Sequence, residues 1–213
     1  MKVLITTVPF ADKNRLPLEQ LNAAGIEYLI NPLNRKLTEN ELADLVTDFD
    51  IIIAGTEPIT DHVIKSASNL KMISRVGIGL DNVDLLAAES RGIKVSYTPD
   101  APAPAVAELT IGLMITLLRS VQLSNIRMHK GEWERYFGRR IANTTIGIIG
   151  LGRIGTRVLN RLKAFGTPRL LVNDLSPNSD LERKFKLEWV DKETIYKESD
   201  VISLHIPLTK ATK

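Results

Sequence analysis

The sequence predicts an α/β protein built from two doubly wound lobes, each with a parallel sheet covered by helices. Short β-branched runs alternate with helical patterns from the first residue, which favours parallel strands joined by crossover helices. The chain has 213 residues, more than one core usually needs and enough for two modest ones. The fold class is therefore α/β, and two lobes are expected.

The first lobe is expected to contain five strands with helices between them. The predicted strands are residues 3–8, 26–30, 51–54, 72–76 and 93–97. Gly25 suits the left-handed residue that often follows a helix, so the first helix should end there. Thr38, followed three positions later by Glu41, predicts a capping box at the start of the second helix.

A proline-rich segment predicts the boundary between the lobes. Residues 98–104 contain three prolines, which continue neither a ladder nor a helix interior. We therefore expect a first lobe at 1–99, flavodoxin-like, which the family resemblance described below makes the substrate lobe, and a second lobe at 100–213. Apolar residues at helical spacing then predict a long buried helix: Val106, Leu109, Leu113, Leu117 and Val121. Glu108 within it suits a catalytic carboxylate or a hydrogen-bonded hinge residue.

The composition excludes some classes of binding partner but identifies none. The formal charge is only +3 with Lys and Arg scattered along the chain, so no nucleic-acid partner is expected. The longest apolar stretch, 105–118, is too short to span a bilayer, so no membrane span is expected. The sequence has no cysteine, which excludes disulfides and thiolate metal sites and is compatible with the cytoplasm. No metal site is expected.

The second lobe begins with a strand that runs directly into a glycine-rich turn. Its predicted strands are residues 145–149, 170–173, 187–190 and 201–204. Gly150 permits a tight turn, Gly152 lets a pyrophosphate approach the backbone, and Gly155 lets helix and strand pack closely. The following helix offers unpaired N–H groups and a positive dipole end to phosphates. This order predicts a Rossmann-type dinucleotide site; the alternative is a tight turn without nucleotide.

An acidic residue at the end of the next strand indicates which dinucleotide binds. Asp174 lies 24 positions after Gly150, where a ribose 2′-hydroxyl is held in such folds. A carboxylate there would repel the 2′-phosphate of NADP. NAD is therefore the predicted cofactor.

Four motifs in order make the chain resemble a known family. They are residues 75–84 (RVGIGLDNVD), 98–108 (TPDAPAPAVAE), the glycine turn, and 200–209 (DVISLHIPLT). The chain resembles the D-isomer-specific 2-hydroxyacid dehydrogenases, especially their phosphoglycerate dehydrogenase-like branch. The resemblance implies hydride transfer between C2 of a D-2-hydroxy acid and nicotinamide, a split substrate lobe, an NAD lobe inserted into it, and a homodimer.

The resemblance also assigns residues. Val76 and Gly77 would hold the substrate carboxylate through free backbone N–H groups, and Arg75 could reach a second anionic group. The alternative is an ordinary glycine turn with Arg75 on a solvated surface. Asp81, Asn82 or Asp84 is expected to cap the next helix. The implied cofactor residues are Thr98, Gly150, Gly152, Arg153, Ile154, Gly155, Asp174, His205, Ile206 and Pro207.

The family's catalytic residues have no matching positions in this sequence. Oxidising a 2-hydroxy acid needs a base for the hydroxyl proton and a cation for the developing carbonyl. In the family these are a histidine supported by a glutamate, and an arginine, all downstream of the His-x-Pro motif. Only residues 208–213 follow that motif here. We expect the second lobe to be truncated and the 213-residue chain alone to be inactive.

Three interpretations remain at this level: a fragment of a full dehydrogenase, a shortened NAD(H)-binding regulatory or interaction module without catalysis, and an association domain that has lost its cofactor. The first is favoured, because every motif present still fits its chemistry. The particular 2-hydroxy acid is not indicated.

Overall fold

The computed structural model describes residues 1–166, 168–209 and 211–212. The chain divides into two compact units, Met1–Ala101 and Pro102–Lys213. Each unit has its own parallel sheet and its own hydrophobic core. The predicted α/β class with two parallel sheets is confirmed.

The first unit is built on a five-stranded parallel sheet in the order β2-β1-β3-β4-β5. Its strands are β1 (Lys2–Ile5), β2 (Glu27–Ile30), β3 (Ile51–Ala54), β4 (Met72–Arg75) and β5 (Lys94–Tyr97). Its helices are α1 (Leu16–Ala23), α2 (Glu39–Leu45), the 3₁₀ turn η1 (Val46–Asp48), α3 (Asp61–Ser66) and α4 (Leu85–Ser90). All neighbouring strands of this sheet are parallel, so their carboxyl ends lie at one edge. The order of strands reverses direction at β1, because β2 lies on one side of it and β3 on the other.

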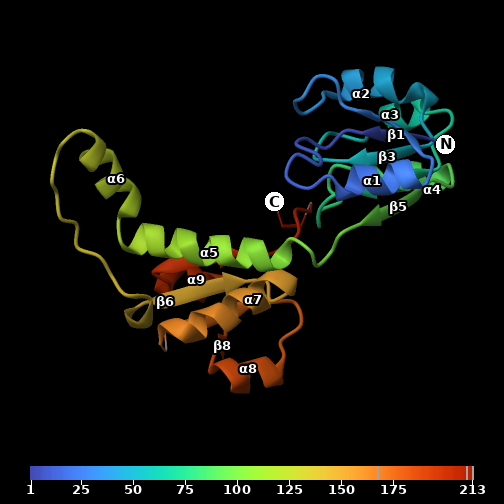
Figure 1. Cartoon of the computed structure of the whole chain (residues 1–213). Helices are drawn as coiled ribbons and strands as arrows, with labels where there is room; N and C mark the ends of the chain where they lie inside the picture. Colours follow the sequence, from blue (N-terminus) through green and yellow to red (C-terminus); the bar gives the residue numbers. More distant parts are fainter. Residues whose placement is uncertain (167, 210, 213) are drawn as a thin grey trace. The chain divides into compact units, whose positions relative to one another are not determined.

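Helices cover both faces of this sheet. Leu42 of α2, Ile64 of α3 and Ala88 of α4 are fully buried with strand residues on one face. On the other face Leu18 of α1 packs against a cluster that contains Ile5 of β1. Figure 1 shows α2 and α3 on one side of β1 and β3, with α1 on the other. The apolar residues therefore form one buried layer on each side of the strands.

Three predicted local signals of the first unit are confirmed. Gly25 follows α1 with φ +65°, a conformation that costs glycine little. The Thr38 hydroxyl accepts a hydrogen bond from the Glu41 amide at 3.4 Å, and the Glu41 carboxylate accepts from the Thr38 amide at 2.9 Å. Asp84 is the residue that caps α4, accepting from the Ala87 amide at 2.9 Å.

The second unit contains a four-stranded parallel sheet in the order β8-β7-β6-β9. Its strands are β6 (Thr145–Ile149), β7 (Arg169–Asn173), β8 (Glu188–Trp189) and β9 (Val201–Leu204). Its helices are α5 (Ala103–Leu118), α6 (Val121–His129), η2 (Ile141–Asn143), α7 (Arg153–Leu162), η3 (Lys163–Phe165), α8 (Ser179–Phe185) and α9 (Lys192–Glu198). Helices α5 and α7 share one core with the strands on one face of the sheet, and Ile195 of α9 packs in a separate cluster on the other face.

Helix α5 is buried on one side only, which corrects the expectation of a buried helix. Ala107, Ile111 and Met114 belong to the core that includes α7. The predicted apolar series lies on the opposite side, where Leu113 is 54% and Leu117 71% exposed. A helix that is apolar all round needs two partners, and within this unit α7 supplies one.

No single helix among the described residues is long and apolar enough to cross a membrane. Taken together, α5 and α6 pass that test by length and composition, but they are bent by 67° at their junction.

Candidate functional site

The glycine turn after β6 contains two glycines that the packing requires. Gly150 has φ +95°, and a Cβ there would lie 2.6 Å from the carbonyl oxygen of His205. A Cβ on Gly155 would lie 2.1 Å from the carbonyl oxygen of Gly150, far inside van der Waals contact. Both positions therefore exclude any side chain while the turn keeps this shape. These contacts agree with the roles predicted for the two glycines, which are a tight turn at Gly150 and a close approach of helix and strand at Gly155.

The middle glycine of the turn faces open space instead. A Cβ on Gly152 would meet no heavy atom within 4 Å. Gly152 is the N-cap of α7, a ten-residue helix whose first turn has no side-chain cap. Its leading N–H groups and positive dipole end thus suit an anion approaching from outside. Arg153 is exposed beside this turn, whereas Ile154 is partly buried and packs against the core.

Asp174 lies directly after β7 and is tied to the glycine turn. One carboxylate oxygen accepts a hydrogen bond from the Leu151 amide at 2.7 Å, and the other accepts from the Ser176 amide at 3.0 Å. The residue is partly buried. Its carboxylate is consequently held beside the turn at the carboxyl edge of β6 and β7, where the sequence placed the ribose contact.

The predicted residues after β9 lie against the same turn. The His205 amide donates to Ile149 O at 2.8 Å, and the Ile206 side chain would lie 2.8 Å from a Cβ on Gly150. The imidazole of His205 lies 2.9 Å from the Ser203 hydroxyl, and burial lowers its pKa below the ordinary value. The neutral imidazole is therefore favoured near neutral pH. Pro207 is exposed.

In the first unit, the carboxyl end of β4 corrects the predicted carboxylate cradle. The Val76 amide donates to Ala54 O at 2.9 Å, and the Gly77 amide donates to the Thr98 hydroxyl at 2.8 Å. The expectation of free N–H groups at these two residues is wrong, because β-ladder and turn contacts already use them. Within the described residues, the amides of Ile78 and Gly79 donate to no protein group. Thr98 belongs to this turn.

Arg75 is buried rather than solvated, with 8% of its surface exposed. Its Nε donates to the Asn82 side-chain oxygen at 3.2 Å, and Nη1 donates to the Val76 carbonyl. The guanidinium lies under Gly77, so a Cβ at Gly77 would come within 2.5 Å of Nη1. Gly77, with φ +148°, therefore makes room for Arg75 beneath the turn.

A buried polar cluster at the same edge was missed by the sequence reasoning. Glu57 is 2% and Thr6 1% exposed. The Glu57 carboxylate accepts hydrogen bonds from the Thr6 hydroxyl and, at 2.8 Å, from the Gly55 amide. The Asn82 side-chain amide donates to the carbonyl oxygen of Glu57 at 2.7 Å, which connects this cluster to Arg75. The only available signal was an acid soon after a buried strand.

Glu108 forms an ion pair within the second unit. Its carboxylate lies 2.7 Å from Nη2 of Arg161 and its side chain is 68% exposed. The same Nη2 donates to the Pro104 carbonyl at 3.2 Å. This arrangement fastens the start of α5 to α7, which favours the hydrogen-bonded role over the catalytic one. Among the described residues, no group of three His, Asp or Glu side chains could hold a metal ion.

Comparison with known proteins identifies the family. Residues 111–213 match the model of the D-isomer specific 2-hydroxyacid dehydrogenase, NAD binding domain. Hydroxypyruvate reductase of Thermotoga maritima is 39% identical over 180 residues, which are 83% of this chain and 58% of that protein. The crystal structure of the TT0316 protein from Thermus thermophilus aligns with a TM-score of 0.85 at 32% identity, over 100% of this chain and 67% of that one.

A further solved structure carries the cofactor. The NAD⁺-bound 3-phosphoglycerate dehydrogenase of Entamoeba histolytica aligns with a TM-score of 0.79 at 32% identity, over 100% of this chain and 65% of that one. The chain belongs to the D-isomer specific 2-hydroxyacid dehydrogenase family. Its second unit is an NAD-binding domain of that family, so the predicted cofactor is confirmed. The chain spans 58% of the length of the Thermotoga relative.

Proposed function

We propose that this chain is the NAD-binding and substrate-cradling part of an oxidoreductase acting on D-2-hydroxy acids, similar to phosphoglycerate dehydrogenase. The uncapped N-terminus of α7 beside Gly152 carries this proposal, because it presents backbone donors to open space. In the proposed complex the pyrophosphate lies against Gly152 and Arg153, and Asp174 accepts from the ribose hydroxyls. His205, Ile206 and Pro207 border the adenosine half of the cofactor.

The turn after β4 is the proposed cradle for the substrate carboxylate. The amides of Ile78 and Gly79, which have no partner among the described residues, supply the donors. Gly77 and Thr98 hold the turn in shape through their mutual hydrogen bonds, and the Val76 amide ties it to Ala54 O. Arg75 adds a positive charge beneath this turn, which favours an anion above it.

Turnover requires further groups. NAD would supply the hydride acceptor for the substrate C2 when bound, and a base would be needed for the hydroxyl proton. Within these 213 residues no position matches the family's catalytic arginine, glutamate or histidine. His205 is not proposed as this base, since its imidazole already contacts the Ser203 hydroxyl at 2.9 Å. We therefore expect the 213-residue polypeptide to bind NADH without turnover, in a cytoplasmic setting that suits a cysteine-free sequence.

Asp174→Asn is the variant that tests the cofactor assignment. Asparagine keeps a carbonyl oxygen for the Leu151 amide but removes the charge that opposes a 2′-phosphate. We expect NADH affinity to fall roughly tenfold and NADPH affinity to rise, since one charge-assisted contact is lost. Fluorescence titration with both cofactors measures the ratio, and Asp180→Asn on α8 serves as the matched control.

Two results would count against this proposal. Absence of NADH binding by the unmodified chain would remove the dehydrogenase and the NAD-module interpretations together and leave an association domain. An unchanged ratio of NADPH to NADH affinity in Asp174→Asn would show that this carboxylate does not face the ribose. Oxidation of NADH by the 213-residue chain with hydroxypyruvate or glyoxylate would contradict the expected inactivity alone.

A homodimer is the proposed assembly, and an exposed apolar face supports it. The face, called here the α5–α6 face, continues onto the segment after α6. Its members are Leu109, Leu113, Leu117, Leu123, Ile126, Trp133 and Phe137. Trp133 is 81% exposed. Several exposed apolar side chains on neighbouring elements are typical of an interaction site in soluble proteins.

Leu113→Glu with Leu117→Glu is expected to convert the dimer to a monomer. Both side chains are more than half exposed in one chain, so charges there leave the fold intact but oppose burial between two chains. Light scattering should change from about twice 23.7 kDa to that value. Leu86→Glu, at an 80% exposed leucine of α4, is the control and should remain dimeric. A monomeric parent chain would refute the assembly.

A further inference from the structure

A pocket of about 470 Å³ lies within the second unit, at the end of the sheet opposite to the glycine turn. It is lined by the end of α5, the segment that leads into η2, and the η3 turn. The glycine turn follows the carboxyl end of β6, whereas this pocket borders Ile141, which precedes the strand. Five strand residues span about 16 Å, so the pocket is separate from the proposed cofactor site.

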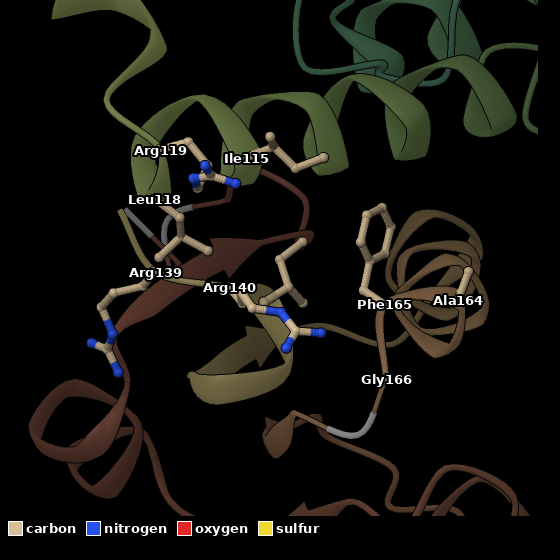
Figure 2. Close-up of a pocket in the computed structure, with 9 residues that line it drawn as sticks. Ile115, Leu118, Arg119, Arg139, Arg140, Ala164, Phe165 and Gly166 are labelled. Atoms are coloured by element: carbon tan, nitrogen blue, oxygen red, sulfur yellow. The ribbon is translucent and has the colours of Figure 1, made fainter. Parts of the chain in front are cut away.

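The pocket combines an apolar floor with guanidinium groups. Ile115, Leu118, Ile141 and Phe165 supply the apolar surface. Arg119, Arg139 and Arg140 also line it. Figure 2 shows the guanidinium groups of Arg119 and Arg140 reaching into the space between α5 and the Phe165 turn, whereas the Arg139 side chain turns away from it. An apolar cavity of this size with a few charged groups is typical of a small-molecule site.

The three arginines differ in how their charge is used. Arg139 is neutralised by Asp200, with N–O distances of 2.5 and 2.9 Å, and this pair lowers the pKa of the Asp200 carboxyl. Among the described residues, Arg119 and Arg140 form no ion pair. The second unit contains 18 Lys and Arg against 11 Asp and Glu, so no general excess of acid compensates them. The pocket therefore presents two cationic groups to whatever enters it.

Arg119 lies close to the backbone of the segment that leads into η2. The Arg139 amide donates to Leu118 O at 2.9 Å, which fastens the incoming segment to the end of α5. A Cβ on Gly138 would lie 2.6 Å from Nε of Arg119 and 3.2 Å from Leu118 O. The absence of a side chain at Gly138 thus lets the arginine lie against the backbone. Phe165, 38% exposed, forms the facing wall.

From this arrangement we propose that the pocket binds a small organic anion, a carboxylate or phosphate carried on an aromatic or short apolar body. The acid would lie between Arg119 and Arg140, because a guanidinium pairs with two oxygens of either group. The body would lie against Phe165, Leu118 and Ile115. The bound molecule is distinct from the 2-hydroxy acid and from NAD, and the proposal does not rest on the proposed function.

Calorimetric titration of the 213-residue chain tests the proposal. The probes are phenyl phosphate and benzoate, with benzyl alcohol as the neutral body and inorganic phosphate as the acid alone. We expect at least one aromatic anion to bind more tightly than both partial probes. Arg119→Gln with Arg140→Gln should weaken it at least about tenfold, because both charge-assisted contacts are removed. Arg183→Gln, at a 77% exposed arginine of α8, is the control for loss of an arginine outside the pocket.

A second variant tests the position of the Arg119 side chain without removing its charge. Gly138→Ala keeps both arginines but displaces the Arg119 side chain, so it should weaken the same anion severalfold while circular dichroism stays unchanged. Three results would overturn the proposal: no aromatic anion binding above the benzyl alcohol level, equal binding by the double variant and the Arg183→Gln control, or competition between the anion and NADH. The last result would assign the anion to the glycine turn.

Discussion

Gly155→Ala and Gly152→Ala are both expected to abolish NAD(H) binding, but only Gly155→Ala should also destabilise the second unit. A methyl group on residue 155 would lie 2.1 Å from the Gly150 carbonyl oxygen, a backbone atom that cannot yield without moving α7 from β6. We expect a loss of about 3 kcal/mol or more, at the upper end for overpacked positions. A methyl group on residue 152 meets no protein atom, so its stability cost should stay within about 1 kcal/mol.

Comparing the two variants distinguishes a loss of stability from a loss of cofactor binding. Both tryptophans, Trp133 and Trp189, lie in the second unit, so urea unfolding followed by tryptophan fluorescence reports on that unit. NADH titration reports on the turn. If Gly152→Ala retained parental NADH affinity, the phosphates would not lie at this N-terminus, whatever Gly155→Ala did. Equal stability of Gly155→Ala and the parent would show that the turn tolerates a different shape.

Features encoded by a few neighbouring residues were predictable from the sequence. The strand–glycine–helix order and the capping box of Thr38 and Glu41 depend on local backbone chemistry, and the structure contains both. Asp174 could be placed at the turn because parallel strands end at one edge of a sheet. Its contact with the Leu151 amide follows from that placement.

Features that depend on tertiary partners were not predictable. The motif beginning at Arg75 indicated a glycine turn, but which amides stay free depends on the neighbours Ala54 and Thr98, which are distant in sequence. The apolar series of α5 correctly indicated a helix. Its periodicity gave no means of deciding which apolar side meets α7, and Leu113 and Leu117 lie on the side that does not.

Glu57→Ala is expected to produce the largest destabilisation in the first unit. The change removes the acceptor for the buried Gly55 amide and the nearer acceptor of the Thr6 hydroxyl, which keeps only the Ile53 carbonyl oxygen at 3.2 Å. An unsatisfied buried donor costs about 1–3 kcal/mol, so the combined loss should be about 3 kcal/mol. Hydrogen exchange measures it locally: the amides of β1 and β3 should lose protection, while those of β6 keep it.

A substitution that preserves the size of the Glu57 side chain distinguishes the effect of its hydrogen bonds from the effect of its volume. Glu57→Gln retains an amide oxygen for the Gly55 amide, so it should cost about 1 kcal/mol and not three. Thr6→Val removes one donor without changing the size of the side chain, and the cost of Glu57→Ala in that background should fall, since the two residues share one bond. Additive costs would mean that the bond between Thr6 and Glu57 contributes nothing to stability. Asn82 connects the Glu57 carbonyl oxygen to the Arg75 side chain. In Glu57→Ala, the amides of Gly77 and Ile78 in the turn after β4 should therefore exchange faster together with those of β3.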